Sequence, residues 1–232
     1  AGDASVKFLI EAKADVESRL ECNALCNVSS APGNTMTSWV DGCRPLHTAA
    51  WHGNLKAVTH LLSAGADANV RTNGQATPLF FSARPYVNHV ELDIAKALLK
   101  KQADCTVIDS RQMNLLHVVA SNQSPDLLKI YLDLGLSAEA LDEDGSTPLH
   151  VSANWGTSSN ISVLAAAMSD LNVQRHKDGQ TPLHRAARSG HRVVVQLLLE
   201  GRADANIQDH SGNRAVDVAT AQGLVDILPD HV

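Results

Sequence analysis

Four histidines occupy equivalent places in short, similar segments of the chain: His47, His117, His150 and His184. Imidazole nitrogens bind zinc and transfer protons near neutral pH. Either chemistry requires several ligating or reactive side chains to converge on one point. The elements that position the four histidines therefore decide whether they form a site.

The segments that contain these histidines recur at a nearly constant interval. They are "RPLHTAA", "TPLFFSA", "NLLHVVA", "TPLHVSA", "TPLHRAA" and "RAVDVAT", starting at Arg44, Thr77, Asn114, Thr147, Thr181 and Arg214. Successive starts differ by 33, 37, 33, 34 and 33 residues. A second pattern, seen in "LLSAGADAN" and "LLLEGRADAN", follows the same period. Two independent patterns with one period of about 33 residues indicate a repeat array.

Together the two patterns resemble the ankyrin repeat, over essentially the whole chain except residues 18–40. The resemblance implies an all-α solenoid of stacked helix-turn-helix units with β-turn fingers, and its usual role is to bind proteins. We expect one domain with a half repeat at 1–17, a long loop at 18–40, repeats at 41–70, 71–107, 108–140, 141–174 and 175–207, and a C-terminal capping repeat at 208–232.

The residues within each repeat favour the same local structure. Thr147 or Thr181 is typical of a helix N-cap, the next proline suits the first helical position, and a histidine at the third can reach back as in a capping box. The apolar stripe of "HRVVVQLLLEG" predicts a second helix, which Gly201 would end in a left-handed turn. The segments "DEDG", "HKDG" and "DHSG" are typical of turns.

This arrangement predicts a structural role for the histidines. One histidine per repeat lies about 10 Å from its nearest copy, which is too far for two to share a metal ion. A zinc site remains conceivable at Cys22, Cys26 and Cys43 with His47 as the fourth ligand. Free thiols in a loop, or a local disulfide, are the alternatives. We expect no metal and no cofactor.

The ends of the array and its third repeat depart from the pattern. The chain begins in mid-repeat with "AGDASVKFLIEAKADVE", so we expect a piece of a longer protein whose residues 1–17 are the least stable part. The longer linker around Pro85 predicts a protruding loop. Arg214, Asp217 and Gln222 predict a terminal helix that faces water.

Composition narrows the class of partner. Nineteen Lys and Arg against 25 Asp and Glu give a net charge of −6, with no basic patch for nucleic acid or an anionic membrane. No apolar run approaches the roughly 18 residues of a membrane helix, and no signal peptide is visible. We expect a monomeric, intracellular domain, most simply cytoplasmic, that neither inserts into membranes nor binds nucleic acid.

The resemblance implies binding through a concave face made of the fingers and the exposed ends of the first helices. The predicted contact residues are Trp39, Trp51, His52, Arg84, Asn122, Asn154, Trp155, Arg188 and Ser189. Tryptophan and arginine are enriched among binding hot spots, but each tryptophan can instead pack under a neighbouring finger. Acidic finger residues favour a basic partner or are simply solvated; they are Asp142, Glu143, Asp144 and Asp178.

The leading interpretation is a non-enzymatic scaffold for a partner protein. An enzyme requires a convergent catalytic set, and the sequence offers none, although a catalytic or channel domain can lie outside this chain. Asn69, Asn172 and Asn206 match the asparagine that hydroxylases modify in similar repeats, so the chain can alternatively be such a substrate. The simpler alternative is that these asparagines satisfy turn backbone.

Overall fold

The computed structural model describes residues 41–83 and 91–224, which fall into two compact units, residues 1–110 and 111–232. Within the described ranges every regular element is a helix, so the fold class is all-α as predicted. The predicted half repeat, the loop at 18–40 and the loop expected around Pro85 lie outside the described residues.

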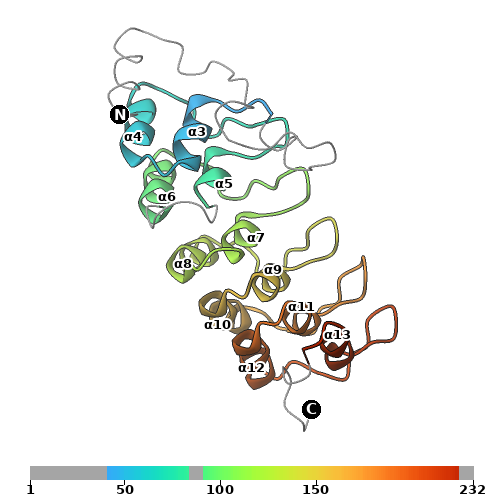
Figure 1. Cartoon of the computed structure of the whole chain (residues 1–232). Helices are drawn as coiled ribbons and strands as arrows, with labels where there is room; N and C mark the ends of the chain where they lie inside the picture. Colours follow the sequence, from blue (N-terminus) through green and yellow to red (C-terminus); the bar gives the residue numbers. More distant parts are fainter. Residues whose placement is uncertain (1–40, 84–90, 225–232) are drawn as a thin grey trace. The chain divides into compact units, whose positions relative to one another are not determined.

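The first unit contains two consecutive helix pairs in its described part (Figure 1). The helices are α3 (Pro45–Trp51), α4 (Leu55–Ser63), α5 (Pro78–Ser82) and α6 (Glu91–Lys100). Helix α3 packs against α5, and α4 packs against α6, so equivalent helices of the two repeats lie side by side.

The second unit repeats this arrangement. Its helices are α7 (Leu115–Ala120), α8 (Pro125–Asp133), α9 (Pro148–Trp155), α10 (Ser158–Ala167), α11 (Pro182–Arg188), α12 (Arg192–Glu200) and α13 (Ala215–Ala221). Helices α7, α9, α11 and α13 form one layer, and α8, α10 and α12 form the other (Figure 1). The turns between repeats project from the side of the first layer (Figure 1).

The first helices begin at the predicted caps. In four repeats the backbone N–H of the N-cap residue donates to Nδ1 of the histidine three positions later, which closes a capping box. The pairs are Arg44 with His47 at 3.0 Å, Asn114 with His117 at 3.2 Å, Thr147 with His150 at 3.1 Å and Thr181 with His184 at 3.3 Å.

The opposite nitrogen of each histidine reaches the next repeat within the same unit. His117 Nε2 donates to the carbonyl of Ser146 at 3.0 Å, and His184 Nε2 donates to that of Asn213 at 3.0 Å. His47 Nε2 bonds to the carbonyl of Ala76 in the same way at 3.2 Å. Because both ring nitrogens are used within the fold, the predicted structural role of these histidines is confirmed.

The second helices bury one apolar stripe, as their sequence period predicts. In α12 the buried residues are Val194, Val195 and Leu198, while Val193 is 62% exposed. Helix α4 begins at Asn54, whose side chain accepts the N–H of Ala57 at 3.0 Å. The interior of each unit is therefore mainly aliphatic, with Phe80 and Phe81 added in the first unit and Tyr131 in the second.

The turns are stabilised by aspartate side chains and by each other. Asp142 accepts the N–H of Asp144 at 3.0 Å and that of Ser146 at 2.7 Å. Backbone hydrogen bonds then join successive turns of the second unit, for example Lys177 N–H to the carbonyl of Asp144 at 3.2 Å. The predicted turn chemistry is confirmed, and consecutive turns are held in register.

Helix α13, the last helix that the structure describes, carries exposed polar residues. Asp217 and Gln222 are exposed, and Arg214 is half-buried. Asp217 takes the place of the capping histidine, because its carboxylate accepts the Arg214 N–H at 2.9 Å. The carboxylate therefore supplies the acceptor that imidazole supplies in the other repeats.

The end of α12 differs from the prediction. Gly201 has φ −75°, and the left-handed residue is Arg202 with φ 70°. The chain turns one residue later because the N–H of Ala203 bonds to the carbonyl of Leu198 at 2.9 Å, the long hydrogen bond of a Schellman motif. Gly65 occupies the same place after α4, so Arg202 carries backbone strain that glycine avoids.

Arg202→Gly should raise the free energy of unfolding by about 1 kcal/mol, because glycine adopts the left-handed region without steric cost. The urea midpoint of the purified chain measures this change. Arg202→Ala removes the same side chain but keeps Cβ, so it should give no gain. A gain as large from alanine would show that the arginine side chain, rather than φ, is the source of the effect.

Candidate functional site

The two described tryptophans occupy different environments. Trp51, the last residue of α3, is half-buried and lies 5.8 Å from the ring of Phe81, measured between ring centroids. Phe81 also makes an edge contact with His47 at 5.1 Å. Trp51 therefore packs against helix α5 of the next repeat, whereas the packing alternative had placed it under a finger; its contact role stays a prediction.

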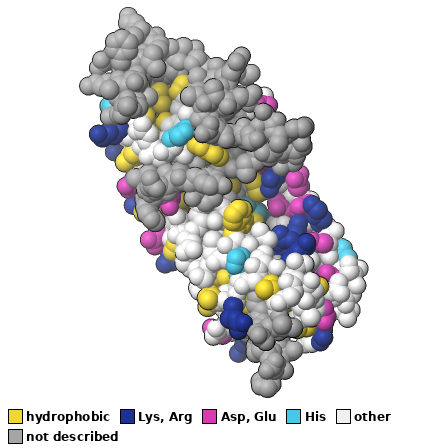
Figure 2. All heavy atoms as spheres, viewed as in Figure 1, with side chains coloured by type: hydrophobic (Ala, Val, Ile, Leu, Met, Phe, Trp, Pro, Cys, Tyr) yellow, Lys and Arg dark blue, Asp and Glu magenta, His cyan; other side chains and the backbone are white. Residues whose placement is uncertain are grey.

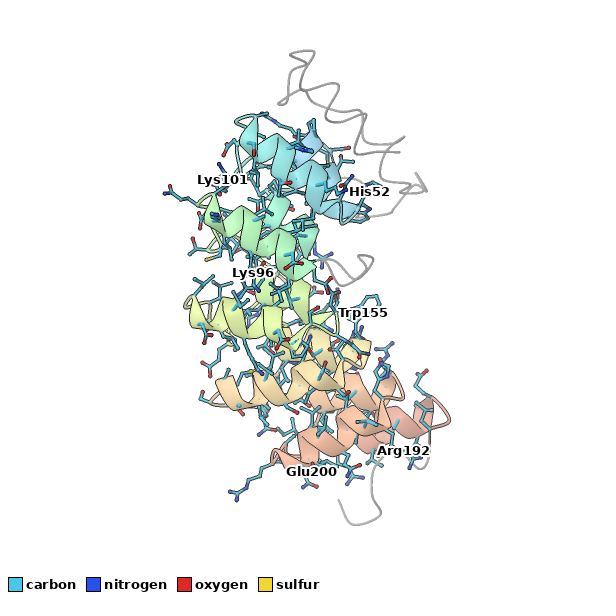
Figure 3. The ribbon with its side chains drawn as sticks, turned by 90° about the vertical axis from the view of Figure 1, so that its left-hand side faces the viewer. His52, Lys96, Lys101, Trp155, Arg192 and Glu200 are labelled. Carbon is cyan, nitrogen blue, oxygen red and sulfur yellow. The ribbon has the colours of Figure 1, made fainter. Side chains whose placement is uncertain are left out.

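Trp155, the last residue of α9, is 58% exposed. Figure 3 shows its side chain projecting away from the ribbon. Gly156 ends the helix in the left-handed region at φ 73°, and a Cβ on Gly156 would come within 2.6 Å of the His191 ring. The backbone that carries Trp155 is thus fixed while its side chain faces solvent.

Asn154, beside Trp155, connects α9 to the next repeat. Its Oδ1 accepts a hydrogen bond from Arg185 Nη2 at 2.6 Å and a long one from Ser189 Oγ at 3.5 Å. Its backbone carbonyl accepts from His191 Nε2 at 3.0 Å. The structure therefore brings Asn154 and Ser189, both predicted contact residues, together with Arg185, which the sequence analysis did not select.

We name this region the α9–α11 surface. Its residues are Val151, Asn154 and Trp155 on α9, Arg185 and Arg188 on α11, and Ser189, the C-cap of α11. On each helix the three positions are spaced i, i+3 and i+4, which places them on one face. The sequence pattern could have identified Arg185, because it directly follows the capping histidine and lies three residues before Arg188, on the same helix face.

Of the other predicted contact residues, the structure describes Trp51, His52 and Asn122. Asn122 is only 6% exposed, because it lies against Asn160, which donates to its backbone carbonyl, so its prediction as a contact residue is not supported by its position. His52 is exposed in the first unit, where its Nδ1 lies 2.9 Å from the carbonyl of Thr48. Trp39 and Arg84 lie outside the described residues.

Acidic residues of the turns are partly neutralised within the second unit. Arg175 forms ion pairs with Asp144 at 3.1 Å and Asp178 at 3.3 Å, and Lys177 pairs with Asp144 at 3.1 Å. Glu143 lies 3.8 Å from Arg111. Figure 2 shows basic and acidic side chains next to each other on this unit. The expected acidic rim is therefore a mixed-charge network, which removes the reason to favour a basic partner.

Arg185 and Arg188 lie beside this network and form no ion pair in the part of the chain that the structure describes. Arg185 is half-buried, and this burial lowers the pKa of its guanidinium from the usual value, with the charge of Arg175 as the next cause. Arg188 is exposed. The α9–α11 surface therefore carries positive charge next to an exposed indole.

The candidate hydroxylation asparagines hold turns together. Asn69 donates to the carbonyl of Gln102 at 3.1 Å and accepts the N–H of Asp104 at 2.6 Å, one repeat away. Asn172 accepts the N–H of Asp204 at 2.8 Å in the same way. Asn206 is exposed and bonds to Asp204 in its own turn. These contacts match the structural alternative, and hydroxylation stays a prediction.

The predicted zinc alternative depends partly on residues outside the described ranges, Cys22 and Cys26. Cys43 is buried, and both nitrogens of His47 are engaged by backbone groups. Among the described residues no cluster of three or more His, Cys, Asp or Glu has the arrangement of a metal site. None of the described helices has the length and hydropathy needed to cross a membrane.

Comparison with known proteins identifies the repeat. The family model described as "Ankyrin repeats (3 copies)" matches residues 1–109, 79–175, 116–209 and 159–228. The crystal structure of the ankyrin repeat domain of Bcl-3, titled a unique member of the IkappaB protein family, matches with a TM-score of 0.63 and 29% identity. The match covers 81% of this chain and 84% of that chain.

Two curated human proteins are also similar. Ankyrin repeat and SOCS box protein 3 is 32% identical over 138 residues, which is 59% of this chain and 26% of that protein. B-cell lymphoma 3 protein is 30% identical over 140 residues, which is 57% of this chain and 30% of that protein. The chain thus spans less than a third of either relative. With the family model matching most of its length, the chain belongs to the ankyrin repeat family.

Proposed function

We propose that this chain is a non-enzymatic protein-binding module that contacts its partner through the α9–α11 surface. Ankyrin repeats generally mediate protein-protein interaction, and the family is shared with the relatives above. The observation that carries the proposal is Trp155, which is 58% exposed although a side chain of that size is usually buried.

The surroundings of Trp155 favour a contact role over a role in stability. Its backbone is fixed by the turn at Gly156 and by the hydrogen bonds of Asn154. Binding of a partner therefore costs little conformational entropy at this position. Tryptophan and arginine are also the residue types most enriched at hot spots, and Arg188 is exposed on the neighbouring helix. A rigid, exposed indole beside arginine is what a protein interface uses as an anchor.

Trp155→Ala should weaken binding of the partner about thirtyfold, since a tryptophan anchor contributes about 2 kcal/mol, and it should leave the unfolding midpoint unchanged. The measurement starts with the proteins that the immobilised chain retains from its native cell extract. Titration of a recovered protein against both versions of the chain then gives the two dissociation constants.

Trp51→Ala is the matched control. Trp51 packs against Phe81, so its truncation should lower the free energy of unfolding by about 2 kcal/mol and leave the affinity unchanged well below the melting temperature. Equal affinities of the wild-type chain and Trp155→Ala for every retained protein would remove the α9–α11 surface from the proposal.

A further inference from the structure

The α9–α11 surface has an excess of positive charge. Four basic residues lie on α11 or in the turn before it: Arg175, Lys177, Arg185 and Arg188. Within residues 41–83 and 91–224, only Asp144 and Asp178 form ion pairs with any of them. Both carboxylates are taken up by Arg175 and Lys177. Among the described residues, Arg185 and Arg188 therefore form no direct ion pair, and Arg185 is influenced by Asp178 and Asp144 only at longer range.

From this charge balance, and resting on the function proposed above, we propose that the α9–α11 surface binds an acidic segment of a partner protein, with Arg185 and Arg188 contacting its carboxylates and Trp155 contacting an adjacent apolar side chain. The surface thus recognises Asp or Glu rather than the basic residues that the acidic turns suggested.

Arg185 is prepared for this contact. Its Nη2 donates to the neutral amide oxygen of Asn154 at 2.6 Å, which fixes the guanidinium plane without neutralising it. The side chain is half-buried, so its charge is already partly removed from water. Charge-assisted hydrogen bonds from guanidinium to carboxylate are about twice as strong as neutral ones, and their strength increases with partial burial.

The geometry also suggests the spacing of the segment. Trp155 and Arg188 lie on α9 and α11, helices that pack side by side. Packed helices are about 8–10 Å apart, and an extended chain advances about 3.3 Å per residue. The apolar side chain and the carboxylates of the partner should therefore be about three residues apart.

A single-stranded nucleic acid is the competing occupant, because bases stack on tryptophan and phosphates bind arginine. The net charge of −6 opposes it, since nucleic-acid binding draws most of its affinity from positive charge spread along the contact. Two unpaired arginines beside an ion-paired network fit a few carboxylates better than a continuous phosphate backbone.

The test uses the whole chain and fluorescein-labelled peptides, with fluorescence anisotropy as the readout. One peptide carries a phenylalanine followed three residues later by two glutamates in a Gly-Ser background. A second has glutamine in place of both glutamates, a third has lysine, and a labelled oligothymidylate represents nucleic acid. The glutamate peptide should bind at least tenfold more tightly than the other three, and salt should reduce the difference.

Arg188→Gln should reduce the affinity for the glutamate peptide toward that for the glutamine peptide, with the remaining preference due to Arg185. Arg185→Lys, which retains the charge but not the planar guanidinium, should have a smaller effect than Arg185→Gln. The control is Lys129→Gln, which removes one exposed positive charge from α8 in the other helix layer of the same unit and should change nothing. Unfolding curves of all variants verify that the fold is intact.

Several results would overturn the inference. They are no binding of the glutamate peptide at millimolar concentration, equal affinity for the glutamine peptide, tighter binding of oligothymidylate, or an equal loss with Lys129→Gln. If Trp155→Ala weakens binding of a cellular partner while Arg188→Gln does not, the proposed function is supported and the preference for an acidic segment is contradicted. If neither variant changes any binding, the proposed function and the acidic preference are both contradicted.

Discussion

Gly145→Ala is expected to lower the free energy of unfolding by about 3 kcal/mol, one of the two largest effects that we predict. Gly145 has φ 79°, in the left-handed region, and a Cβ there would come within 2.6 Å of the backbone N of His176 in the next turn. The added methyl group meets backbone, which cannot rotate away. Consecutive turns would therefore have to separate.

Gly212→Ala is the matched control for this prediction. Gly212 occupies the same place in its turn and has φ 80°, but a Cβ there would have nothing within 4 Å. Its substitution should cost about 1 kcal/mol, from the left-handed conformation alone. Chemical denaturation of both variants gives the difference, which measures the stacking of one turn on the next. Equal losses would show that this close approach contributes no stability.

His150→Leu should also cost about 3 kcal/mol, because it removes hydrogen bonds from groups that stay buried. His150 Nδ1 accepts the N–H of Thr147 at 3.1 Å and lies 2.9 Å from its hydroxyl, and Nε2 donates to the carbonyl of Gln180 at 3.1 Å. Leucine leaves both Thr147 donors without this acceptor. Denaturation at pH 7 measures the loss, and His150→Gln, which can retain a donor and an acceptor, should lose less.

His150 should also make stability depend on pH. Burial lowers its pKa to about 3, and the nearby charges of Arg175 and Arg185 act in the same direction. Its pKa in the unfolded chain is about 6.5, so the contribution is complete above that pH and is lost as the pH falls toward 3. At pH 5 the loss from this residue is about 2 kcal/mol.

Denaturation of the wild-type chain and of His150→Gln between pH 7 and pH 5 tests this dependence. The variant cannot take up this proton on unfolding, so its stability should fall less steeply with decreasing pH than that of the wild type. Parallel curves for the two proteins would mean that His150 exchanges its proton equally in the folded and unfolded chains.

The acidic turns predict a basic partner, but the ion pairs between neighbouring repeats favour an acidic one. The sequence places Asp144 and Asp178 in turns, where each looks like a free acidic residue. In the fold Arg175 lies between them and pairs with both. Next to these pairs, Arg185 and Arg188 form no ion pair among the residues that the structure describes. A sum of charges along the sequence has no information about which of them are paired in space.

The repeat period and the capping chemistry were readable from the sequence because they depend on residues close together in the chain. A capping box spans three residues, as between Thr181 and His184, and a buried stripe spans one helix. The capping role of the histidines also followed from such local rules. The same rules placed the left-handed residue after α12 at Gly201, whereas in the structure it is Arg202, one residue later.

The sequence by itself therefore determined the all-α ankyrin fold, the helix starts and the role of the histidines, whereas only the tertiary structure decided between the two tryptophans. Trp51 lies at the position after Arg44 that Asn154 occupies after Thr147, and Trp155 lies one position later in its repeat. Phe81 of the next repeat packs against the Trp51 ring, whereas the Trp155 side chain is 58% exposed. Exposure depends on the neighbouring repeat, and that neighbour is set by packing across the array rather than by the local pattern.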